Sequence, residues 1–256
     1  MPGVLDSFRL DGRVACVTGT TRGIGRTAAV ALAEAGCDIV QIDRRDPGET
    51  RAEIERLGRR GAHVELDLAE ADAAACERAI DAATAAFGRL DILVNSAGIV
   101  ARGSVLDVGA EEVERVLHVN LGCVLALSRA AGRVFVAQQS GAIVNVASLL
   151  SFQGGVLVSS YVIAKHGVVG VTRALANEWA QHGVRVNAIA PGYIATDFTV
   201  ALRDDERRYQ EILGRIPAGR WGASEDLAGA FVYLCSPASA YVTGQVLTVD
   251  GGWMSR

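Results

Sequence analysis

A tyrosine and a lysine, Tyr161 and Lys165, lie four positions apart in an otherwise small and apolar stretch, SSYVIAKHGVVG, at residues 159–170. If this stretch is helical, the spacing places both side chains on one face. An ammonium group close to a phenol favours the phenolate, so the pair could take a proton from an alcohol or return one to a ketone. The same spacing also arises by chance in many helices, so the pair has to be judged with the rest of the chain.

A glycine-rich turn, TGTTRGIG at residues 18–25, follows an apolar run and opens a helix-like segment. Glycine lets the backbone turn tightly and approach a pyrophosphate closely, and the free N–H groups at a helix start favour the phosphate charge. The alternative is a simple strand-to-helix turn. We expect a dinucleotide cofactor to contact Gly19, Thr21, Arg22, Gly23, Ile24 and Gly25.

An acidic residue, Asp43, ends the second apolar run. An acid at this place can accept hydrogen bonds from the adenosine ribose hydroxyls and repel a 2′-phosphate. It therefore predicts NAD rather than NADP, although Arg44 and Arg45 follow at once and could hold such a phosphate. Asp67, after the third run, is a weaker candidate for an adenine contact, and its alternative role is to begin the next helix.

The elements that must position these residues can be read from an alternation of short β-branched runs with longer segments rich in Ala, Leu, Glu and Arg. Seven runs read as strands, at residues 13–18, 37–43, 63–68, 90–95, 141–148, 183–192 and 244–252. This alternation predicts a single α/β domain over 1–256, a Rossmann-type doubly wound parallel β-sheet with helices on both faces. Residues 193–222 are too long for a simple connection and are predicted to form a substrate lid.

Composition excludes several classes of protein. The chain has 256 residues, of which half are hydrophobic and 21% are charged, and its net charge is −4 without a basic block, so nucleic acid is not an expected partner. Its five cysteines are scattered without metal-ligand spacing, which predicts no metal site and a reducing compartment. The first residues lack a signal-peptide pattern, and no apolar run reads as a membrane span. We expect a cytoplasmic protein without a membrane partner.

Four features now occur in order: TGTTRGIG at 18–25, NSAG at 95–98, Ser148, and YVIAK at 161–165. Together they resemble the short-chain dehydrogenase/reductase family, and the resemblance runs to the TVDGGW near the C-terminus. One departure is Ser96, where the family more often has a second asparagine. The resemblance implies a nicotinamide dinucleotide cofactor and a homotetramer built by pairing the helices that follow strands four and five.

The resemblance also implies a catalytic set of Asn120, Ser148, Tyr161 and Lys165. Tyr161 would transfer the proton, and Lys165 would supply the charge that lowers its pKa and would hold the ribose. Ser148 would polarise the substrate oxygen. Asn120 would interrupt its helix and anchor a water that relays the proton. The alternatives are a strand-end cap for Ser148 and a mid-helix side chain bonded to its own backbone for Asn120.

Further cofactor contacts follow from the same resemblance, including the PGYIAT stretch after strand six. They comprise Asp67, Leu68, Asn95, Ala97, Gly98, Tyr161, Lys165, Pro191, Gly192, Ile194 and Thr196.

Stretches in the second half, ASLLSFQGG at 147–155 and RIPAGRWG at 215–222, resemble the sugar-acid branch of the family. That resemblance implies oxidation of a secondary hydroxyl on a deoxy sugar acid, or the reverse reduction. A carboxylate needs a cation, and Arg102 is the first candidate, with Gln153 as a further substrate contact beside Ser148 and Tyr161. The lid arginines Arg203, Arg207 and Arg208 are further candidates.

Two other functions stay open. A 3-oxoacyl-carrier-protein reductase, or another carbonyl reductase, would prefer NADPH and a basic docking patch, and Asp43 with the acidic balance counts against it. A non-catalytic dinucleotide sensor would not need the complete set of Ser148, Tyr161 and Lys165.

Overall fold

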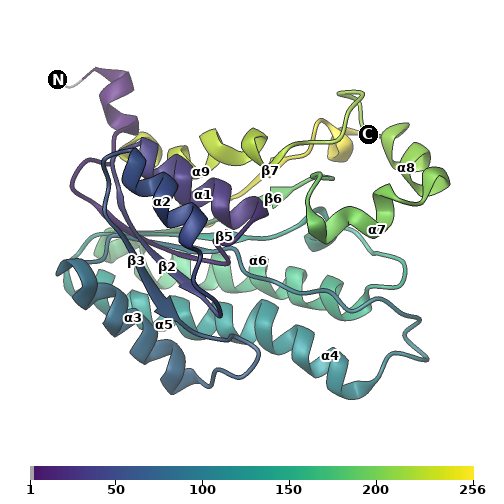
Figure 1. Ribbon diagram of the computed structural model, residues 1–256, viewed down its shortest axis with the longest axis horizontal. Helices are drawn as coiled ribbons and strands as arrows, with labels where there is room; N and C mark the ends of the chain where they lie inside the picture. Colours follow the sequence, from purple (N-terminus) through teal and green to yellow (C-terminus); the bar gives the residue numbers. More distant parts are fainter. Residues whose placement is uncertain (1–2) are drawn as a thin grey trace.

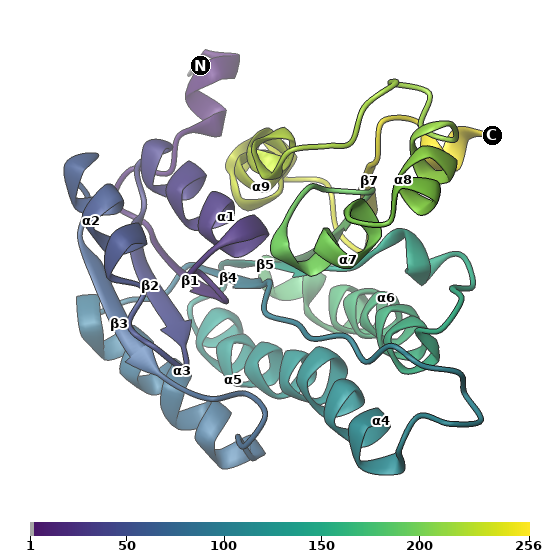
Figure 2. The same ribbon diagram turned by 45° about the vertical axis from the view of Figure 1, so that its right-hand side comes forward.

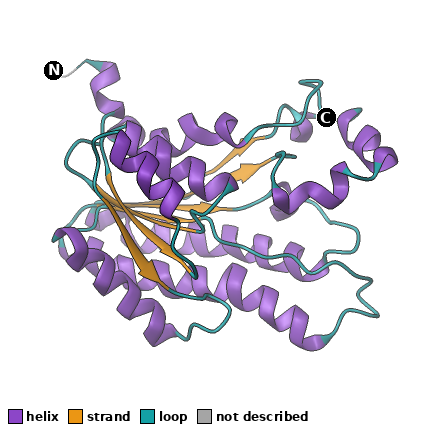
Figure 3. Cartoon of the chain, in the orientation of Figure 1, coloured by secondary structure: helices purple, strands orange, loops and turns teal. Residues whose placement is uncertain are grey.

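The computed structural model describes residues 3–256, so Met1 and Pro2, the first residues of the stretch judged above for a signal peptide, lie outside the described residues. A sheet of seven parallel strands, in the order β3-β2-β1-β4-β5-β6-β7, forms the centre of the molecule, and helices cover both of its faces (Figures 1 and 3). The predicted single-domain Rossmann-type sheet is therefore confirmed. The strands are β1 (Val14–Thr18), β2 (Asp38–Asp43), β3 (Gly61–Glu65), β4 (Ile92–Asn95), β5 (Gly141–Val146), β6 (Val184–Pro191) and β7 (Val246–Val249).

The inner strands are buried over their whole length, as in β1, β4 and β5. Parallel strands covered on both faces are built from continuous apolar runs rather than alternating ones, which explains why the β-branched runs are visible in the sequence.

Two groups of helices cover the sheet from opposite sides (Figure 2). One face carries α1 (Gly23–Glu34), α2 (Gly48–Arg56) and α9 (Ala228–Cys235). The other carries α3 (Ala73–Phe87), α5 (Cys123–Ala137) and α6 (Ser159–Trp179). The remaining α-helices of residues 3–256 are α4 (Ala110–Leu117), α7 (Val200–Arg203) and α8 (Glu206–Leu213). Each face has its own apolar core, one around Phe231 and one around Phe135.

Some predicted strands are shorter in the structure, and one expected helix interruption is present. The third strand ends at Glu65 rather than residue 68, because β2, its one neighbour within residues 3–256, ends opposite it in the pair Asp43–Glu65. The helical run after strand four is interrupted at Asn120, as expected, by a π-helical turn, η2 (His118–Gly122), between α4 and α5. Asp67 therefore lies beyond its strand, and Asn120 lies within the π turn.

The helical run Ala110–Ala137 is long and apolar enough to cross a membrane by length and composition, contrary to the expectation from the sequence. In its most apolar window, 56% of the residues are buried inside the protein. Its α5 portion packs on α3 and on the sheet, so the apolar face is used within the fold.

Residues 193–222, here called the lid segment, contain the 3₁₀ turn η5 (Asp197–Thr199) followed by α7 and α8. The lid segment and the C-terminus share a separate apolar cluster, in which Tyr193 contacts Trp221 and Trp253 with ring centroids 5.4 and 4.7 Å apart. Tyr209 stacks on Trp221 with an interplanar angle of 2°.

Candidate functional site

The predicted site residues follow the carboxyl ends of neighbouring strands. The glycine-rich turn follows β1 and the NSAG loop follows β4, and these two strands are paired at the centre of the sheet. The helices that leave them, α1 and α5, lie on opposite faces (Figure 2). Such a switch point is where open α/β sheets bind ligands.

The glycine-rich turn leaves no room for a Cβ at Gly19 or Gly25. A Cβ on Gly25 would lie 2.1 Å from the carbonyl oxygen of Gly19, and Gly19 itself has a φ of +75°. The hydroxyl of Thr18 accepts hydrogen bonds of 3.0 Å from the backbone N–H groups of Ser96 and Ala97, which ties the turn to the NSAG loop. The open N-terminus of α1 and its close-packed glycines fit the pyrophosphate of a dinucleotide.

Asp43 faces the glycine-rich turn. Its Oδ2 accepts hydrogen bonds from the backbone N–H of Thr20 at 2.9 Å and from the hydroxyl of Thr20 at 2.6 Å. Burial raises the pKa of Asp43, and the hydrogen bonds from Thr20 oppose this. Arg44 and Arg45 are exposed.

Asp67 and Leu68 lie in the loop after β3. The Oδ1 of Asp67 accepts from the backbone N–H of Ala69 at 2.9 Å, while the N-cap of α3 is Asp72. The alternative in which Asp67 begins the next helix is therefore wrong. The carbonyl oxygen of Leu68 accepts a hydrogen bond from the Cys123 thiol at 3.2 Å.

Ser148 and Tyr161 are brought together from β5 and α6. Ser148 lies two residues past β5 and caps the 3₁₀ turn η3 (Leu149–Ser151), with its Oγ accepting from Leu150 at 3.2 Å. Burial raises the pKa of Tyr161 to about 12, and the Ser148 side chain and the charge of Arg102 oppose this rise. The capping alternative for Ser148 is thus real, and its side chain is also close enough to the tyrosine to lower the pKa of the phenol.

Lys165 lies beside the tyrosine, with its Nζ 5.5 Å from the centre of the Tyr161 ring. The ammonium donates a hydrogen bond of 2.5 Å to the carbonyl oxygen of Val146, and 4% of the residue is exposed. Burial lowers the pKa of Lys165 to about 8. The Ser151 hydroxyl donates to the Lys165 carbonyl at 2.7 Å and fixes α6 against η3.

Asn120 is fully buried in the π turn. Its amide N–H donates to the carbonyl oxygen of Ile99 at 2.7 Å, and its Oδ1 accepts from the N–H of Ile99 at 2.8 Å. The alternative in which Asn120 bonds its own helix is therefore wrong, because the side chain holds the loop after β4. Gly98 is close, since a Cβ there would lie 3.2 Å from Asn120 Oδ1.

The side chain of Asn95 points into the core rather than to the edge of the sheet. It is 3% exposed, and its amide donates to Ser128 Oγ at 3.0 Å and to Asn145 Oδ1 at 2.8 Å. Asn145 in turn donates to Thr172 Oγ1 at 3.0 Å. This network joins β4 and β5 to α5 and α6, so the predicted cofactor contact is not available to the Asn95 side chain as it lies here.

The residues after β6 reach back to the glycine-rich turn. Pro191 ends β6, and Gly192 packs so closely that a Cβ would lie 2.6 Å from the Cα of Asp250. Ile194 is buried and bridges to Gly222. The Cγ2 of Thr196 lies 3.5 Å from where a Cβ on Gly23 would be.

Arg102 and the lid segment meet over the tyrosine. The Nη2 of Arg102 donates to the carbonyl oxygen of Phe198 at 3.3 Å, and the Phe198 ring lies 5.5 Å from the Tyr161 ring. Gln153 is held by the C-terminus, because its Oε1 accepts from the indole N–H of Trp253 at 3.1 Å.

The lid arginines differ in role. Arg207 and Arg208 both pair with Glu211 on the surface of α8. Arg203 donates to the carbonyl oxygen of Thr196 at 3.1 Å, and its buried Nε has no partner among residues 3–256.

Three residues that contact predicted site residues were not predicted from the sequence: Thr20 contacts Asp43, Phe198 contacts Arg102, and Trp253 contacts Gln153. Thr20 lies in the glycine-rich turn and Trp253 in the TVDGGW stretch, so both belong to recognised motifs. The sequence pattern does not indicate which side chains these residues contact.

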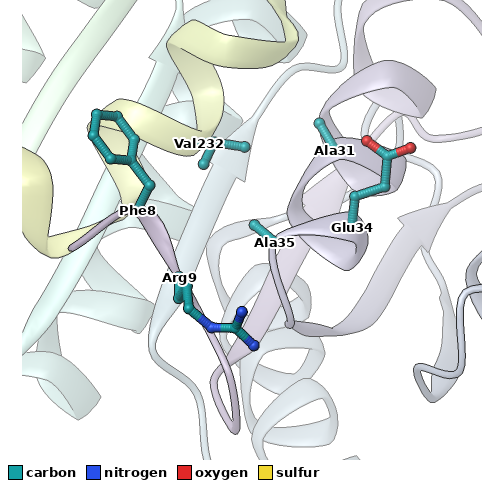
Figure 4. A pocket seen from close by; sticks show the side chains of 6 residues that line it. All are labelled: Phe8, Arg9, Ala31, Glu34, Ala35 and Val232. Atoms are coloured by element: carbon teal, nitrogen blue, oxygen red, sulfur yellow. The ribbon is translucent and has the colours of Figure 1, made fainter. Parts of the chain in front are cut away.

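A shallow pocket elsewhere carries none of the predicted residues (Figure 4). It lies where the end of α1 meets η1 (Val4–Phe8) and α9, away from the carboxyl edge of the sheet, and is lined by Phe8, Arg9, Ala31, Glu34, Ala35 and Val232. Within residues 3–256, no group of three or more His, Cys, Asp or Glu side chains is arranged to hold a metal ion.

Comparison with known proteins gives consistent matches. A family model described as enoyl-(acyl carrier protein) reductase matches residues 19–254. The chain is 49% identical to the 2-dehydro-3-deoxy-D-gluconate 5-dehydrogenase of Escherichia coli (strain K12) over 254 residues, covering 99% of this chain and 100% of the relative.

Two solved structures match over nearly the whole chain. A proposed 2-deoxy-D-gluconate 3-dehydrogenase from Agrobacterium tumefaciens with bound NADP is 48% identical, with a TM-score of 0.92 and coverage of 98% of this chain and 99% of that one. A gluconate 5-dehydrogenase from Burkholderia cenocepacia in complex with NADP and tartrate is 38% identical, with a TM-score of 0.94 and coverage of 99% and 100%.

Proposed function

The chain belongs to the short-chain dehydrogenase/reductase family, and we propose that it interconverts a secondary hydroxyl and a ketone on a deoxy sugar acid, as a 2-dehydro-3-deoxy-D-gluconate 5-dehydrogenase or a 2-deoxy-D-gluconate 3-dehydrogenase does. The observation that carries the chemistry is the meeting of Ser148, Tyr161 and Lys165 at the carboxyl edge of the sheet. The substrate class rests on the relatives, because those with high identity are named for sugar acids of this type.

The residues of the chain handle the proton. In oxidation, the Tyr161 oxygen takes the proton of the substrate hydroxyl, and in reduction it returns one to the ketone oxygen. Ser148 holds the same substrate oxygen, and the Lys165 ammonium, whose Nζ lies 5.5 Å from the centre of the Tyr161 ring, stabilises the phenolate. A bound nicotinamide dinucleotide supplies the hydride acceptor or donor. Asn120 completes the proposed set by fixing the π turn against the loop after β4, beside which a relay water would bind.

The substrate carboxylate is assigned to Arg102. This guanidinium lies close enough to lower the pKa of Tyr161, and its one hydrogen bond within residues 3–256, to Phe198, leaves donors for a carboxylate. Gln153 is the second proposed contact. Phe198 of the lid segment already lies against Arg102 and Tyr161, and the complex of a relative with tartrate, a small hydroxy acid, agrees with an acid-binding site.

The sequence predicted NAD rather than NADP, whereas the relatives indicate that NADP also has to be considered. Asp43 favours NAD, but two relatives were solved with NADP. We propose that the chain accepts both dinucleotides.

A homotetramer in the cytoplasm is the proposed assembly and location. The outer faces of α5 and α6, which lie side by side (Figures 1 and 2), expose Leu125 at 45% and Ile163 at 56%. Covering such apolar side chains by a second copy would remove them from water. Ile163→Asp should lower the mass measured by light scattering, while Arg45→Asp, away from these helices, should not.

The decisive experiment is turnover with a panel of ketoaldonic acids, neutral polyols and oxoacyl thioesters, using NAD(H) and NADP(H). Tyr161→Phe should bind dinucleotide normally and lose at least about 10³-fold in kcat. Normal biological function of Tyr161→Phe would instead identify a sensor, and a preference for oxoacyl thioesters would identify a carrier-protein reductase. Arg102→Ala should raise KM for sugar acids far more than for polyols, and equal effects would refute the carboxylate assignment.

A further inference from the structure

We propose that Thr20 is a positioning residue for cofactor selectivity: it holds the Asp43 carboxylate against the glycine-rich turn, so that the acid does not exclude a 2′-phosphate and the site accepts NADP as well as NAD. This inference rests on the proposed use of a nicotinamide dinucleotide, but not on the identity of the substrate.

The first observation is a two-point contact on a single oxygen. Oδ2 of Asp43 receives both the N–H of Thr20 at 2.9 Å and its hydroxyl at 2.6 Å. Thr20 is fully buried and Asp43 is 8% exposed. Hydrogen bonds to an ionised group are short and strong, so this pair fixes the direction of the carboxylate.

The second observation is that the hydrogen-bond partners of Thr20 fix the direction of its hydroxyl proton. Its oxygen already accepts a hydrogen bond of 2.9 Å from the amide of Gln41, which is fully buried in β2. A hydroxyl has a single proton, so the proton of Thr20 is directed to Asp43. The Thr50 hydroxyl donates to the Thr20 carbonyl at 2.9 Å and fixes the backbone from α2.

The third observation concerns the surface that remains for the ribose. With Oδ2 committed to Thr20, Oδ1 is the oxygen left to accept from a ribose hydroxyl, which preserves NAD binding. Arg44 and Arg45 follow directly, are exposed, and form no ion pair or side-chain hydrogen bond within the part of the chain that the structure describes. A phosphate on the ribose would therefore meet free guanidinium groups and a screened acid.

If Thr20 lost its hydroxyl, the carboxylate would keep backbone N–H donors, from Thr20 and Thr21, but no hydroxyl, and could turn toward the ribose. Its charge would then repel a 2′-phosphate and bind the two hydroxyls of NAD better. Thr20→Val removes the hydroxyl at nearly constant volume, and Thr20→Ser keeps it. Asp43→Asn removes the charge on which Thr20 acts.

The test measures the dissociation constants of NADPH and NADH by cofactor fluorescence on the full chain, without sugar substrate, for these three variants and the Thr20→Val/Asp43→Asn double variant. We expect the unaltered chain to bind the two within about tenfold of each other. In Thr20→Val, NADPH should weaken about tenfold while NADH stays level or tightens, and Thr20→Ser should keep the original ratio. In the Asp43→Asn background, Thr20→Val should no longer change the ratio.

Thermal unfolding of each variant shows whether it is folded, and Thr20→Ala replaces Thr20→Val if the latter is not. Equal weakening of both dinucleotides in Thr20→Val would overturn the proposal, because it would indicate only a structural role. Binding of NADPH at least a hundredfold weaker than NADH by the unaltered chain would also overturn it. Normal binding without turnover of any sugar acid would instead refute the proposed function and leave this inference standing.

Discussion

The indole N–H of Trp253 donates a hydrogen bond of 3.1 Å to the side-chain carbonyl oxygen of Gln153, which lies 100 positions earlier in the chain. The Trp253 ring is itself held by the Tyr193 ring at 4.7 Å and by the Arg215 guanidinium at 4.0 Å. An amide that accepts on its oxygen side presents its NH₂ group on the other side. The C-terminus therefore orients Gln153 as a donor.

Trp253→Phe keeps an aromatic ring but removes the N–H that orients Gln153. The KM for a sugar acid should rise about three- to tenfold, with kcat changed less than about twofold, because one net hydrogen bond of preorganisation is lost. Steady-state kinetics measure both constants. Trp221→Phe is the matched control, since the buried Trp221 Nε1 has no partner within residues 3–256. The same rise in KM for both variants would mean that the aromatic cluster, not the Gln153 contact, is responsible.

Lys165→Met should stabilise the protein while abolishing turnover. Burial lowers the Lys165 pKa from 10.5 to about 8, so folding carries the cost of a buried ammonium at neutral pH. The free energy of unfolding at pH 7 should rise by about 1–3 kcal/mol, with denaturant unfolding as the measurement.

The stability that Lys165→Met gains over the unaltered protein should depend on pH in a definite direction. Between pH 8 and 10.5 the unfolded chain binds more protons at Lys165 than the folded chain, so the stability of the unaltered protein rises with pH in this window. The advantage of Lys165→Met should therefore shrink from pH 8 upward. Arg173→Met, an exposed change on the same helix, should have little effect at any of these pH values. Destabilisation by Lys165→Met at pH 7 would contradict the argument.

Arg102→Ala should shift the pH profile of alcohol oxidation. Burial raises the pKa of Tyr161 to about 12, and the Arg102 charge opposes this rise. Removing this charge raises the pKa, so the rising limb of kcat/KM for oxidation should move to higher pH. The measurement uses a neutral polyol, so that loss of a carboxylate contact does not interfere. Arg207→Ala, whose guanidinium pairs with Glu211, should leave the profile in place, and an unmoved profile in Arg102→Ala would refute the electrostatic link.

Gly25→Ala should abolish dinucleotide binding. Its Cβ would lie 2.1 Å from the Gly19 carbonyl oxygen, and neither backbone segment can yield without opening the turn. Fluorescence titration with NADH should show at least about a hundredfold weaker binding, and circular dichroism shows whether the fold survives. In Gly229→Ala, the added Cβ meets nothing within 4 Å in the first turn of α9. That control should bind normally and gain up to about 1 kcal/mol of stability. Unimpaired binding by Gly25→Ala would refute the assignment of the turn.

The amino-acid sequence was sufficient to predict those parts of the structure that depend on residues close together in the chain. Buried parallel strands need continuous apolar runs, which made the sheet and its carboxyl ends predictable. Because those ends meet at one edge, residues such as Ser148 and Asp43 could be expected near the same site from their positions after strands. Helical spacing likewise brought Tyr161 and Lys165 to one face.

Other features depend on side chains that meet only after folding. The end of β3 is decided by its neighbour, where Asp43 pairs with Glu65, and not by its own residues. The direction of the Asp43 carboxylate is decided by Thr20, and that of the Gln153 amide by Trp253. Each of these is a choice of rotamer or register made by a partner distant in sequence. Periodicity and spacing carry no information on such partners, so only the tertiary structure decides which oxygen of an acid, or which side of an amide, is left to face a ligand.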